Sequence, residues 1–433
     1  MNNKFSANSL SQWLNYLENG MVDGKIELGL ERVESVRKRM DLHPNCPVIV
    51  VAGTNGKGSV CAYLTQIYHA AGYRVGTLTS PHLLRFNERI AVDGQAVGDD
   101  EIVSAFACIE EARQDVALTY FEFNTLAAVQ IFNLQQVDVM VLEVGLGGRL
   151  DAVNIFDADV SVITTVDLDH EAYLGNTIED VAYEKAGVMR SGRPTILGQE
   201  YIPLKLNNYA QKIFADLLIL GKDFACNQRT ESMWTYCFQP QFSNGLVGHE
   251  HKFDLPMPAL QGGFQLNNAA CALTVLACLQ ELLPVEVGAI RQGLIEVKHT
   301  GRFEVLPGKP MRIVDVGHNP HAARALRQSL QALPTAAKRL AVFSMLSDKD
   351  IETVLEILRD QFDEWFIASL STSRGLNVKQ LQMHFAKFNS CQVHSFDNIQ
   401  LAYQAALTRA GENDRIVIFG SFHTVAEILT SLT

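Results

Sequence analysis

The sequence lacks the features that mark secreted, membrane-spanning and nucleic-acid-binding proteins. Its apolar runs, such as 48–52 and 269–279, are far shorter than the ~18 residues that span a bilayer, and its opening residues show no cationic stretch followed by an apolar one. There is no long Lys/Arg run, and 36 basic against 48 acidic residues give a formal charge of −12. A polyanionic ligand must therefore be bound locally. We expect a cytoplasmic protein with small-molecule partners, no nucleic acid and no membrane.

Paired cysteines are also missing. The eight Cys are scattered without a C-x-x-C pair, and the chain of 433 residues is 47% apolar. A chain of this size buries enough core to fold without covalent links, so we expect reduced thiols, no disulfide framework and no zinc site. At roughly 100–200 residues per domain, the length predicts two or three buried cores.

Between residues 47 and 188, short β-branched runs alternate with amphipathic stretches. The sequence predicts strands at 48–53, 75–80, 137–145 and 160–167 and helices at 59–71, 99–113 and 122–135. Strands that are apolar on both faces and separated by helices are typical of a parallel sheet covered on both sides. Residues 190–260 are less regular, and we expect the antiparallel edge of the same domain there. Helix 266–283 is apolar nearly all round, which predicts burial.

The alternation of strands and helices restarts after Glu296. Strands are predicted at 312–316, 340–345, 365–369, 392–395 and 416–421, with helices at 321–333, 350–360, 377–386, 398–410 and 422–432. Five such steps predict a second, Rossmann-like domain. The expected fold class is therefore α/β: a P-loop-type ATPase domain with a mostly parallel sheet (1–295) and a C-terminal Rossmann-like α/β domain (296–433).

The segment VIVVAGTNGKGSV (48–60) is a buried strand that runs into a Gly-rich turn and a helix. Backbone N–H groups of such a turn converge on phosphate oxygens, Lys57 supplies a positive charge, and Ser59 or Thr54 supplies a hydroxyl. The common G-x-x-x-x-G-K-[ST] pattern is altered, since Val51 stands in its first position. An ordinary Gly-rich turn is the alternative, but the setting favours nucleotide phosphate. The predicted phosphate-binding residues are Gly53, Thr54, Asn55, Gly56, Lys57, Gly58 and Ser59.

Further polar residues stand at or just beyond the carboxyl ends of predicted strands: Ser80, Glu143, His170 and the pair Glu184–Lys185. Open α/β sheets bind their ligands at this edge. A hydroxyl, a carboxylate and an imidazole suit Mg²⁺ bound to ATP, which takes few protein ligands. Each residue alone has a simpler explanation as a surface or capping residue, and GLGG (145–148) can be only a turn. Their joint occurrence beside the phosphate loop favours a metal site.

Nine blocks occur in order along the chain: GTNGKGS (53–59), TSPHLLRFNERI (79–90), EVGLGGRLDAVN (143–154), LDH (168–170), YEKAGV (183–188), GGFQLNNAA (262–270), GRFE (301–304), DVGHNPHA (315–322) and FGSFHTVAE (419–427). In these blocks the chain resembles the folylpolyglutamate synthases of the Mur ligase superfamily, in particular the bacterial bifunctional dihydrofolate synthase/folylpolyglutamate synthases. The resemblance covers nearly the whole chain. It implies ATP-driven ligation, in which the carboxylate of a pterin substrate is phosphorylated and the amine of L-glutamate displaces phosphate to form an amide.

The resemblance also implies roles for single residues. Loop 53–59 would hold the ATP phosphates, and Lys185 matches a lysine that the family carries as a carbamate at a second metal ion. Catalytic roles fall to Lys57, Lys185 and His318. The implied metal ligands are Ser80, Glu143, His170 and Lys185, and the implied ATP contacts beyond the loop are Asn268, Arg302 and, at the ribose, Asp315. The implied substrate residues are Phe86, Asn87, Glu88 and Arg89, with segment 22–32 at the outer wall of the pterin site.

Several alternatives stay open at this point. A cell-wall-type Mur ligase would carry a separate N-terminal domain, whereas only about 46 residues precede the first strand, and a regulatory P-loop switch would not need the second domain. Arg302 can be an interdomain salt-bridge residue, and Asp315 and His318 can cap strand ends. Lys185 can pair with Glu184 or another carboxylate on its helix. The family usually has a small or hydroxyl residue where this chain has Val153. Since the family is mostly monomeric, we expect a monomer.

Overall fold

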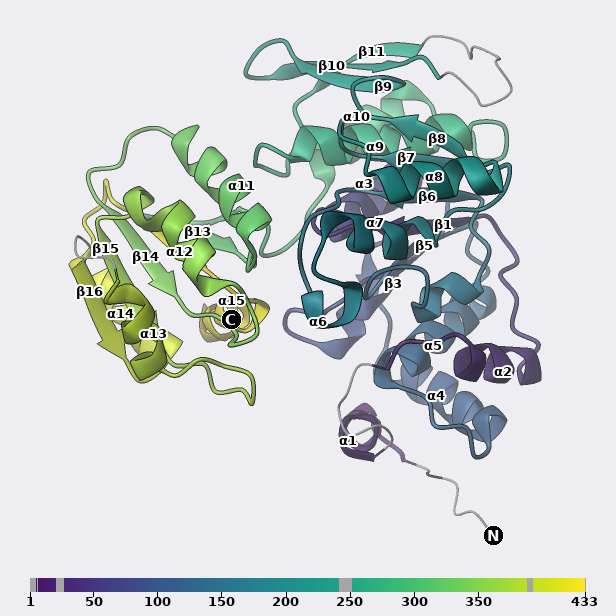
Figure 1. Cartoon of the computed structure of the whole chain (residues 1–433), viewed down its shortest axis with the longest axis horizontal. Helices are drawn as coiled ribbons and strands as arrows, with labels where there is room; N and C mark the ends of the chain where they lie inside the picture. Colours follow the sequence, from purple (N-terminus) through teal and green to yellow (C-terminus); the bar gives the residue numbers. More distant parts are fainter. Residues whose placement is uncertain (1–4, 6, 21–26, 241–250, 388–391, 433) are drawn as a thin grey trace. The chain divides into compact units, whose positions relative to one another are not determined.

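The computed structural model describes residues 5–432 apart from residue 6 and segments 21–26, 241–250 and 388–391. The chain divides into two compact units (Figure 1). The first comprises Met1–Ala259 with Leu266–Val297, and the second comprises Leu260–Gln265 with Lys298–Thr433. Among the described residues, no helix is long and apolar enough to cross a membrane.

An eight-stranded sheet forms the centre of the first unit, in the order β4-β3-β2-β5-β1-β6-β7-β8. Its strands are β1 Val48–Ala52, β2 Val75–Leu78, β3 Ile90–Val92, β4 Gln95–Ala96, β5 Val139–Glu143, β6 Val160–Ile163, β7 Pro194–Leu197 and β8 Asp216–Ile219. All neighbouring pairs from β2 to β8 are parallel. Every residue of β1 and β5 is buried, as expected for a sheet covered on both faces. The carboxyl ends of β2, β5, β1 and β6 therefore lie side by side.

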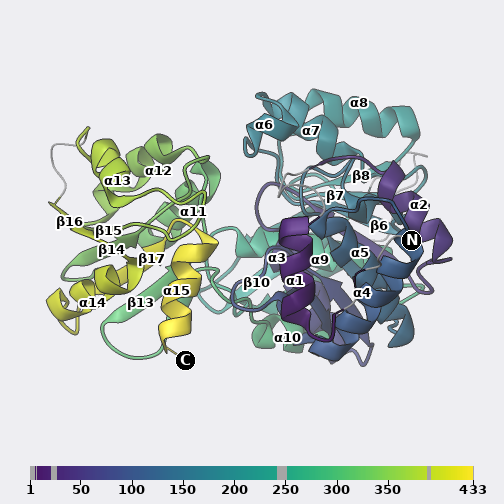
Figure 2. The same ribbon diagram turned by 90° about the horizontal axis from the view of Figure 1, so that it is seen from below.

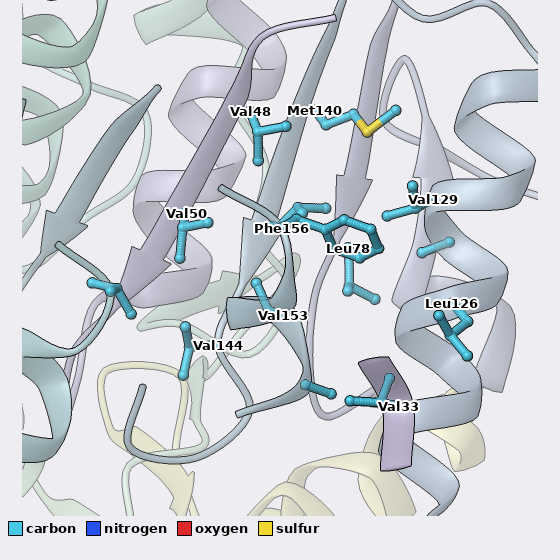
Figure 3. Close-up of a cluster of buried hydrophobic side chains, with 14 of the residues drawn as sticks. Val33, Val48, Val50, Leu78, Leu126, Val129, Met140, Val144, Val153 and Phe156 are labelled. Carbon is cyan, nitrogen blue, oxygen red and sulfur yellow. The ribbon is translucent and has the colours of Figure 1, made fainter. Parts of the chain in front are cut away.

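Helices pack on this sheet and on one another. They are α1 Leu10–Gly20, α2 Glu31–Arg39, α3 Lys57–Ala70, α4 Asp99–Arg113, α5 Tyr120–Leu134, α6 Glu171–Leu174, α7 Ile178–Ala186, α8 Leu204–Ile213, α9 Gln265–Cys278 and α10 Val287–Glu296, with the 3₁₀ turns η1 Phe86–Arg89 and η2 Ala152–Ile155. Figure 3 shows Val33 of α2, Leu126 of α5 and Val153 of η2 in one apolar cluster with the strand residue Val50. Val153 is thus a core residue, which explains why an apolar side chain is suitable there.

The expectation for residues 190–260 is wrong in part. Strands β7 and β8 extend the parallel sheet through the crossover helix α8, whereas β9 Phe224–Gln228, β10 Met233–Phe238 and β11 His251–Pro256 form a separate antiparallel sheet. The antiparallel edge of the large sheet is instead the hairpin β3–β4. Its turn residues Asp93 and Gly94 both have positive φ, 54° and 72°, which is the Asp-Gly hairpin preference. Helix α9 also ends earlier than predicted, at Cys278.

The second unit has a six-stranded sheet in the order β12-β13-β17-β14-β15-β16, and only β12 is antiparallel to its neighbour. Its elements are β12 Glu304–Leu306, β13 Met311–Asp315, α11 Pro320–Gln331, β14 Arg339–Phe343, α12 Ile351–Leu358, η3 Arg359–Gln361, β15 Glu364–Ala368, α13 Val378–Phe385, β16 Gln392–Phe396, α14 Ile399–Arg409, β17 Arg415–Phe419 and α15 Phe422–Leu432. Figure 2 shows α12 and α13 on one face of this sheet and α14 and α15 on the other. The predicted Rossmann-like α/β architecture is confirmed.

Candidate active site

The predicted phosphate loop joins β1 to α3. Gly53 has φ +145°, and a Cβ there would lie 1.8 Å from Oγ1 of Thr164, so only glycine fits. Gly56 caps α3 with φ 89°, a conformation that favours glycine. The Nζ of Lys57, the first residue of α3, donates to the carbonyl of Gly53 at 3.0 Å. The lysine therefore folds back over the loop, and its charge adds to that of the helix N-terminus.

The two hydroxyls proposed for this loop are in different situations. Oγ1 of Thr54 donates to the carbonyl of Asp167 at 2.9 Å and accepts its N–H at 3.0 Å. The hydroxyl of Thr54 thus ties the loop to the segment after β6. Ser59 lies in the first turn of α3 and is 3% exposed. Both residues thus lie at the start of the helix that follows the Gly-rich turn or in the turn itself, and Ser59 is buried there.

Asn268, on α9, lies against the same loop. A Cβ on Gly56 would approach its Oδ1 to 2.5 Å, so the side-chain amide packs directly over the glycine. Asn268 is 6% exposed. Asn268 is 212 positions after Gly56 in the sequence, and the fold brings the two together.

Ser80 and Glu143 meet at the ends of the neighbouring strands β2 and β5. The backbone N–H of Ser80 donates to Oε2 of Glu143 at 3.0 Å. Glu143 is the last residue of β5 and is 3% exposed. A buried carboxylate is costly unless hydrogen bonds or cations compensate its charge, and the N–H of Ser80 provides one such hydrogen bond.

The loop after β5 packs on α7. The backbone N–H of Arg149 donates to the carbonyl of Glu184 at 2.7 Å, and its guanidinium pairs with Oε1 of Glu184 at 2.8 Å. A Cβ on Gly187 would lie 2.3 Å from Cβ of Arg149. Glu184 therefore pairs with Arg149. This pairing excludes the simple alternative in which Glu184 is the partner of Lys185.

Lys185 is buried, with 3% of its surface exposed. Burial, and next the charge of Lys57, lower the pKa of its ammonium group to about 7, against the attraction of Asp169 and Asp151. The carboxyl of Asp151 accepts N–H bonds from Leu146 at 2.8 Å and Val153 at 3.0 Å, and burial raises its pKa to about 7.

The sequence prediction missed Asp151 and Asp169. Both lie in the loop that follows a buried strand, Asp151 in GGRLD and Asp169 in DLD, and this position was the available signal. His170 directly follows Asp169, whose Oδ1 accepts the N–H of His170 at 2.8 Å. His170 has the left-handed backbone conformation, φ 52°, and its side chain is 33% exposed.

Of the residues proposed for a metal, Ser80 and Glu143 are in contact. In the described part of the chain, no group of three or more His, Cys, Asp or Glu side chains is arranged to hold a metal ion. Ser80, Glu143 and His170 offer a hydroxyl, a carboxylate and an imidazole. This set fits a hard divalent cation that keeps phosphate and water ligands, and it does not resemble an all-protein cage.

Two of the four residues predicted to contact the pterin hold their own loop. The carboxylate of Glu88 accepts the N–H groups of Leu83, Leu84 and Arg85. Nδ2 of Asn87 donates to the carbonyl of Val97 at 2.9 Å and to Asp99 at 2.8 Å. Both line a pocket of about 350 Å³ between this loop and residues 96–99. Through these bonds, Asn87 and Glu88 stabilise the conformation of their own loop.

Arg89 differs from these two because its guanidinium is largely buried among rings. It lies 5.7 Å from the centroid of Phe86 and 5.2 Å from that of Tyr120, and its Nε donates to Nδ1 of His82 at 2.8 Å. Burial lowers its pKa, while Tyr120 and Glu143 act in the opposite direction. His82 and Tyr120 are further residues that the sequence prediction did not single out.

Segment 22–32 falls partly outside the described residues, which begin again at Glu27. Its described end reaches the loop after β5, since the N–H of Gly29 donates to the carbonyl of Leu150 at 3.3 Å. The residue after Leu150 is Asp151, one of the carboxylates around Lys185.

In the second unit, Arg302, Asp315 and His318 gather at the carboxyl end of β13. Asp315 accepts N–H bonds from Gly317 at 2.7 Å and Phe303 at 2.9 Å, and burial raises its pKa against the effect of Arg302. The Arg302 guanidinium lies 5.2 Å from the ring centroid of Phe422, and the His318 ring lies 6.1 Å from it. Nδ1 of His318 is 2.9 Å from the carbonyl of Val316, so this nitrogen carries the proton and donates it.

Comparisons with known proteins identify the family of the chain. Residues 51–276 match the Mur ligase middle domain, and residues 301–422 match the Mur ligase glutamate ligase domain. The chain is 41% identical over 425 residues to the dihydrofolate synthase/folylpolyglutamate synthase of Escherichia coli (strain K12), covering 98% of this chain and 96% of that protein. It is 40% identical over 447 residues to the protein of the same name from Haemophilus influenzae, covering 98% and 97%.

Solved structures give the same result. The structure of E. coli FolC in complex with DHPP and ADP has a TM-score of 0.89 and 42% identity and covers 98% of both chains. A bifunctional folylpolyglutamate synthase/dihydrofolate synthase from Yersinia pestis, complexed with AMPPNP and Mn ion, has the same TM-score of 0.89 and 42% identity, again over 98% of both chains. The chain therefore belongs to the dihydrofolate synthase/folylpolyglutamate synthase family of the Mur ligases.

Proposed function

We propose that this protein is an ATP-dependent carbon–nitrogen ligase that joins L-glutamate to dihydropteroate, giving dihydrofolate, and to folate glutamate chains, giving folylpolyglutamates. Full-length relatives with 41% and 40% identity carry both activities in their names, which supports this function over that of a cell-wall-type Mur ligase. The observation that carries the proposal is the shared sheet edge. It holds the phosphate loop with Lys57, the Ser80–Glu143 contact and the buried Lys185.

The reaction requires two anions to approach each other. A carboxylate oxygen of the pterin substrate attacks the γ-phosphorus of ATP and ADP leaves; the glutamate amine then attacks the acyl carbon, phosphate leaves, and the nitrogen loses a proton. Lys57 and the N-terminus of α3 bind the phosphates and offset their charge. A divalent cation bound with ATP supplies further charge neutralisation. Ser80, Glu143 and His170 are the residues we assign to hold it.

We also propose that Lys185 is carbamylated and contributes to a second ion site. With a pKa of about 7, much of this lysine is a neutral amine near neutral pH and can react with CO₂. The product is an anion with two oxygens, a suitable hard ligand. Protein grown with ¹³C-bicarbonate should give a carbamate carbon signal that is absent from Lys185→Ala. A fully active Lys185→Ala enzyme, or a wild-type protein without the signal, would contradict this assignment.

The two parts of the chain are given separate tasks in this proposal. Residues 1–295 bind ATP and the pterin, with Asn268 beside the phosphate loop and Phe86 and Arg89 near the pterin. Residues 296–433 form the glutamate-ligase domain, in which Arg302 contacts ATP and Asp315 the ribose. His318 acts near the acyl phosphate. We infer a monomer that works on small molecules in the cytoplasm. The charge of −12 supports the inference that neither nucleic acid nor membrane is a partner.

A substrate panel tests the function. ADP formation should depend on both L-glutamate and a pterin acid, with dihydropteroate, dihydrofolate and tetrahydrofolates assayed one by one. ATP hydrolysis that is independent of both, or activity only with a cell-wall precursor, would contradict the proposal. The products should be identified by mass, since each ligation adds one glutamyl residue.

A further inference from the structure

Arg415, the first residue of β17, is a buried cation of the second unit and is 5% exposed. One terminal nitrogen, Nη2, donates to the carbonyl of Pro334. Among the described residues, the buried Nε of Arg415 has no hydrogen-bond partner. Burial lowers the pKa of Arg415, the charge of Arg339 lowers it further, and no carboxylate of the described chain counters these two effects. Since a buried charge is costly without a counter-charge, this guanidinium calls for an anion.

The nearby acidic residues are engaged by other cations. Arg339 starts the neighbouring strand β14 and pairs in register with Arg415. Nη2 of Arg339 donates to Oδ1 of Asp363 at 2.8 Å, and its backbone N–H donates to Oδ2 at 2.7 Å. Asp360 lies 2.6 Å from the guanidinium of Arg327. Asp363 therefore offsets the charge of Arg339, whereas the charge of Arg415 is left without compensation.

A cavity of about 410 Å³ adjoins the two paired arginines. This volume lies within the range of about 300–1,000 Å³ that is usual for small-molecule sites. The side chains of Arg339 and Asp363 are 37% and 43% exposed, so a solute can reach the cavity from solvent. Two arginines against one aspartate give its lining an excess of one positive charge. The apolar part of the lining includes Leu330, Phe362 and Val417.

This cavity is separate from the group formed by Arg302, Asp315 and His318. Arg415 pairs with Met311 at the start of β13, whereas Asp315 at the end of β13 pairs with Phe419. Because successive residues of a strand rise by about 3.3 Å, the two ends of β17 lie about 13 Å apart. The cavity is thus at the amino edge of the sheet, opposite to the edge at which open α/β sheets commonly bind their ligands.

We propose that this cavity is a binding site for a small organic anion, whose carboxylate or phosphate group accepts a hydrogen bond from Nε of Arg415. The planar guanidinium matches the oxygens of either group. The apolar lining would contact the carbon part of the ligand. The bond from Nη2 to Pro334 has a structural role in holding the loop after α11, but it does not account for the unpaired Nε or for the cavity beside it.

The test observes Nε itself. The full-length protein is labelled with ¹⁵N-arginine, and the Nε–H signal of Arg415 is assigned by its absence from Arg415→Lys. Sodium phosphate, sodium malonate and sodium chloride are then titrated at equal ionic strength. We expect a saturable shift of this signal with phosphate or malonate and none with chloride, and the anion with the lower Kd identifies the preferred group. The shift should persist in Lys57→Ala, which separates this cavity from the phosphate loop.

Variants measure the contribution of Arg415 to affinity. The Nε–H signal of Arg339, which also lines the cavity, reports binding when Arg415 is replaced. We expect Arg415→Gln to raise the Kd of the anion by about tenfold or more, since it removes a charged hydrogen-bond donor. Arg415→Lys keeps the charge but lacks Nε–H and the planar fork, so it should also weaken binding. Arg327→Gln is the matched control, because Arg327 pairs with Asp360, and the Kd should stay within about twofold of wild type.

The inference is overturned by a wild-type signal that does not shift, by a shift that chloride reproduces, or by an unchanged Kd in Arg415→Gln. If Arg415→Gln does not fold, the wild-type titration and Arg415→Lys decide by the same criteria. None of these readouts uses turnover, so the result is independent of the ligase function proposed above.

Discussion

The backbone N–H of Ser80 donates to Oε2 of Glu143 at 3.0 Å. This bond joins the ends of two parallel strands and fixes the orientation of a carboxylate that is 3% exposed. One oxygen of Glu143 is thereby held by the protein itself. We propose that the charge of this carboxylate serves a cation bound with ATP.

Glu143→Gln separates these two tasks. The amide oxygen can still accept the N–H of Ser80, but the negative charge is lost. We expect kcat to fall by on the order of 10²–10³-fold, since several kcal/mol of charge stabilisation depend on the bound cation. The melting temperature should change little. Steady-state ADP formation and thermal unfolding measure the two effects, and near-wild-type turnover would remove Glu143 from the assigned ligands.

Lys57→Ala should abolish turnover and leave the fold intact. The Nζ of Lys57 donates to the carbonyl of Gly53, and the charge of Lys57 is one of the causes that lower the pKa of Lys185. The ammonium of Lys185 should therefore titrate at higher pH in this variant. Activity, thermal unfolding and the NMR titration of labelled lysine provide the three readouts. A variant that ligates glutamate at the wild-type rate would show that the phosphate-loop assignment is wrong.

Lys185→Met should stabilise the protein near neutral pH when CO₂ and metal ions are removed. The pKa of Lys185 is about 7 in the fold against 10.5 for an ordinary lysine. The unfolded chain thus binds the extra proton between these values, so wild-type stability rises with pH from 7 to 10.5. At pH 7 and below the variant should be more stable by about 4–5 kcal/mol.

This difference should shrink as the pH approaches 10.5. Urea unfolding of both proteins at pH 6.5, 8 and 9.5 measures it, with Lys212→Met as the control because Lys212 lies in the last turn of α8 and carries an exposed side chain. A difference in unfolding free energy that does not depend on pH would mean that Lys185 is charged when buried.

His318→Ala should lower kcat much more than it weakens ATP binding. Nδ1 of His318 donates to the carbonyl of Val316, which fixes the orientation of the ring. A ring held near the acyl phosphate would act in the reaction, whereas ground-state binding falls mainly to Arg302 and Asp315. Kinetics and ATP titration, compared in the same buffer, separate the effects. Equal losses in kcat and ATP affinity would limit His318 to ground-state binding.

Much of the fold follows from local sequence. The helix predicted at 99–113 begins and ends at the observed residues of α4, because Gly98 precedes a first turn of three acidic residues, which favour a helix N-terminus. The uninterrupted apolar runs that became β1 and β5 are long enough to be recognised as buried strands. Residues 190–260 were harder to predict, because short apolar runs such as 194–197 do not show whether their neighbours are parallel or antiparallel.

The candidate site also combines features that the sequence predicted with features that only the fold shows. Sequence by itself predicted the Gly-rich turn between β1 and α3, because glycines 53 and 56 and Lys57 lie close together in the chain and the chemistry of a βα turn is local. Only the tertiary structure decided that Glu184 binds Arg149, that Asn268 covers Gly56, and that Lys185 is buried beside Lys57. The physical reason is that pairing and burial depend on strand order and helix packing, which bring together residues that are far apart in the chain and so leave no local pattern.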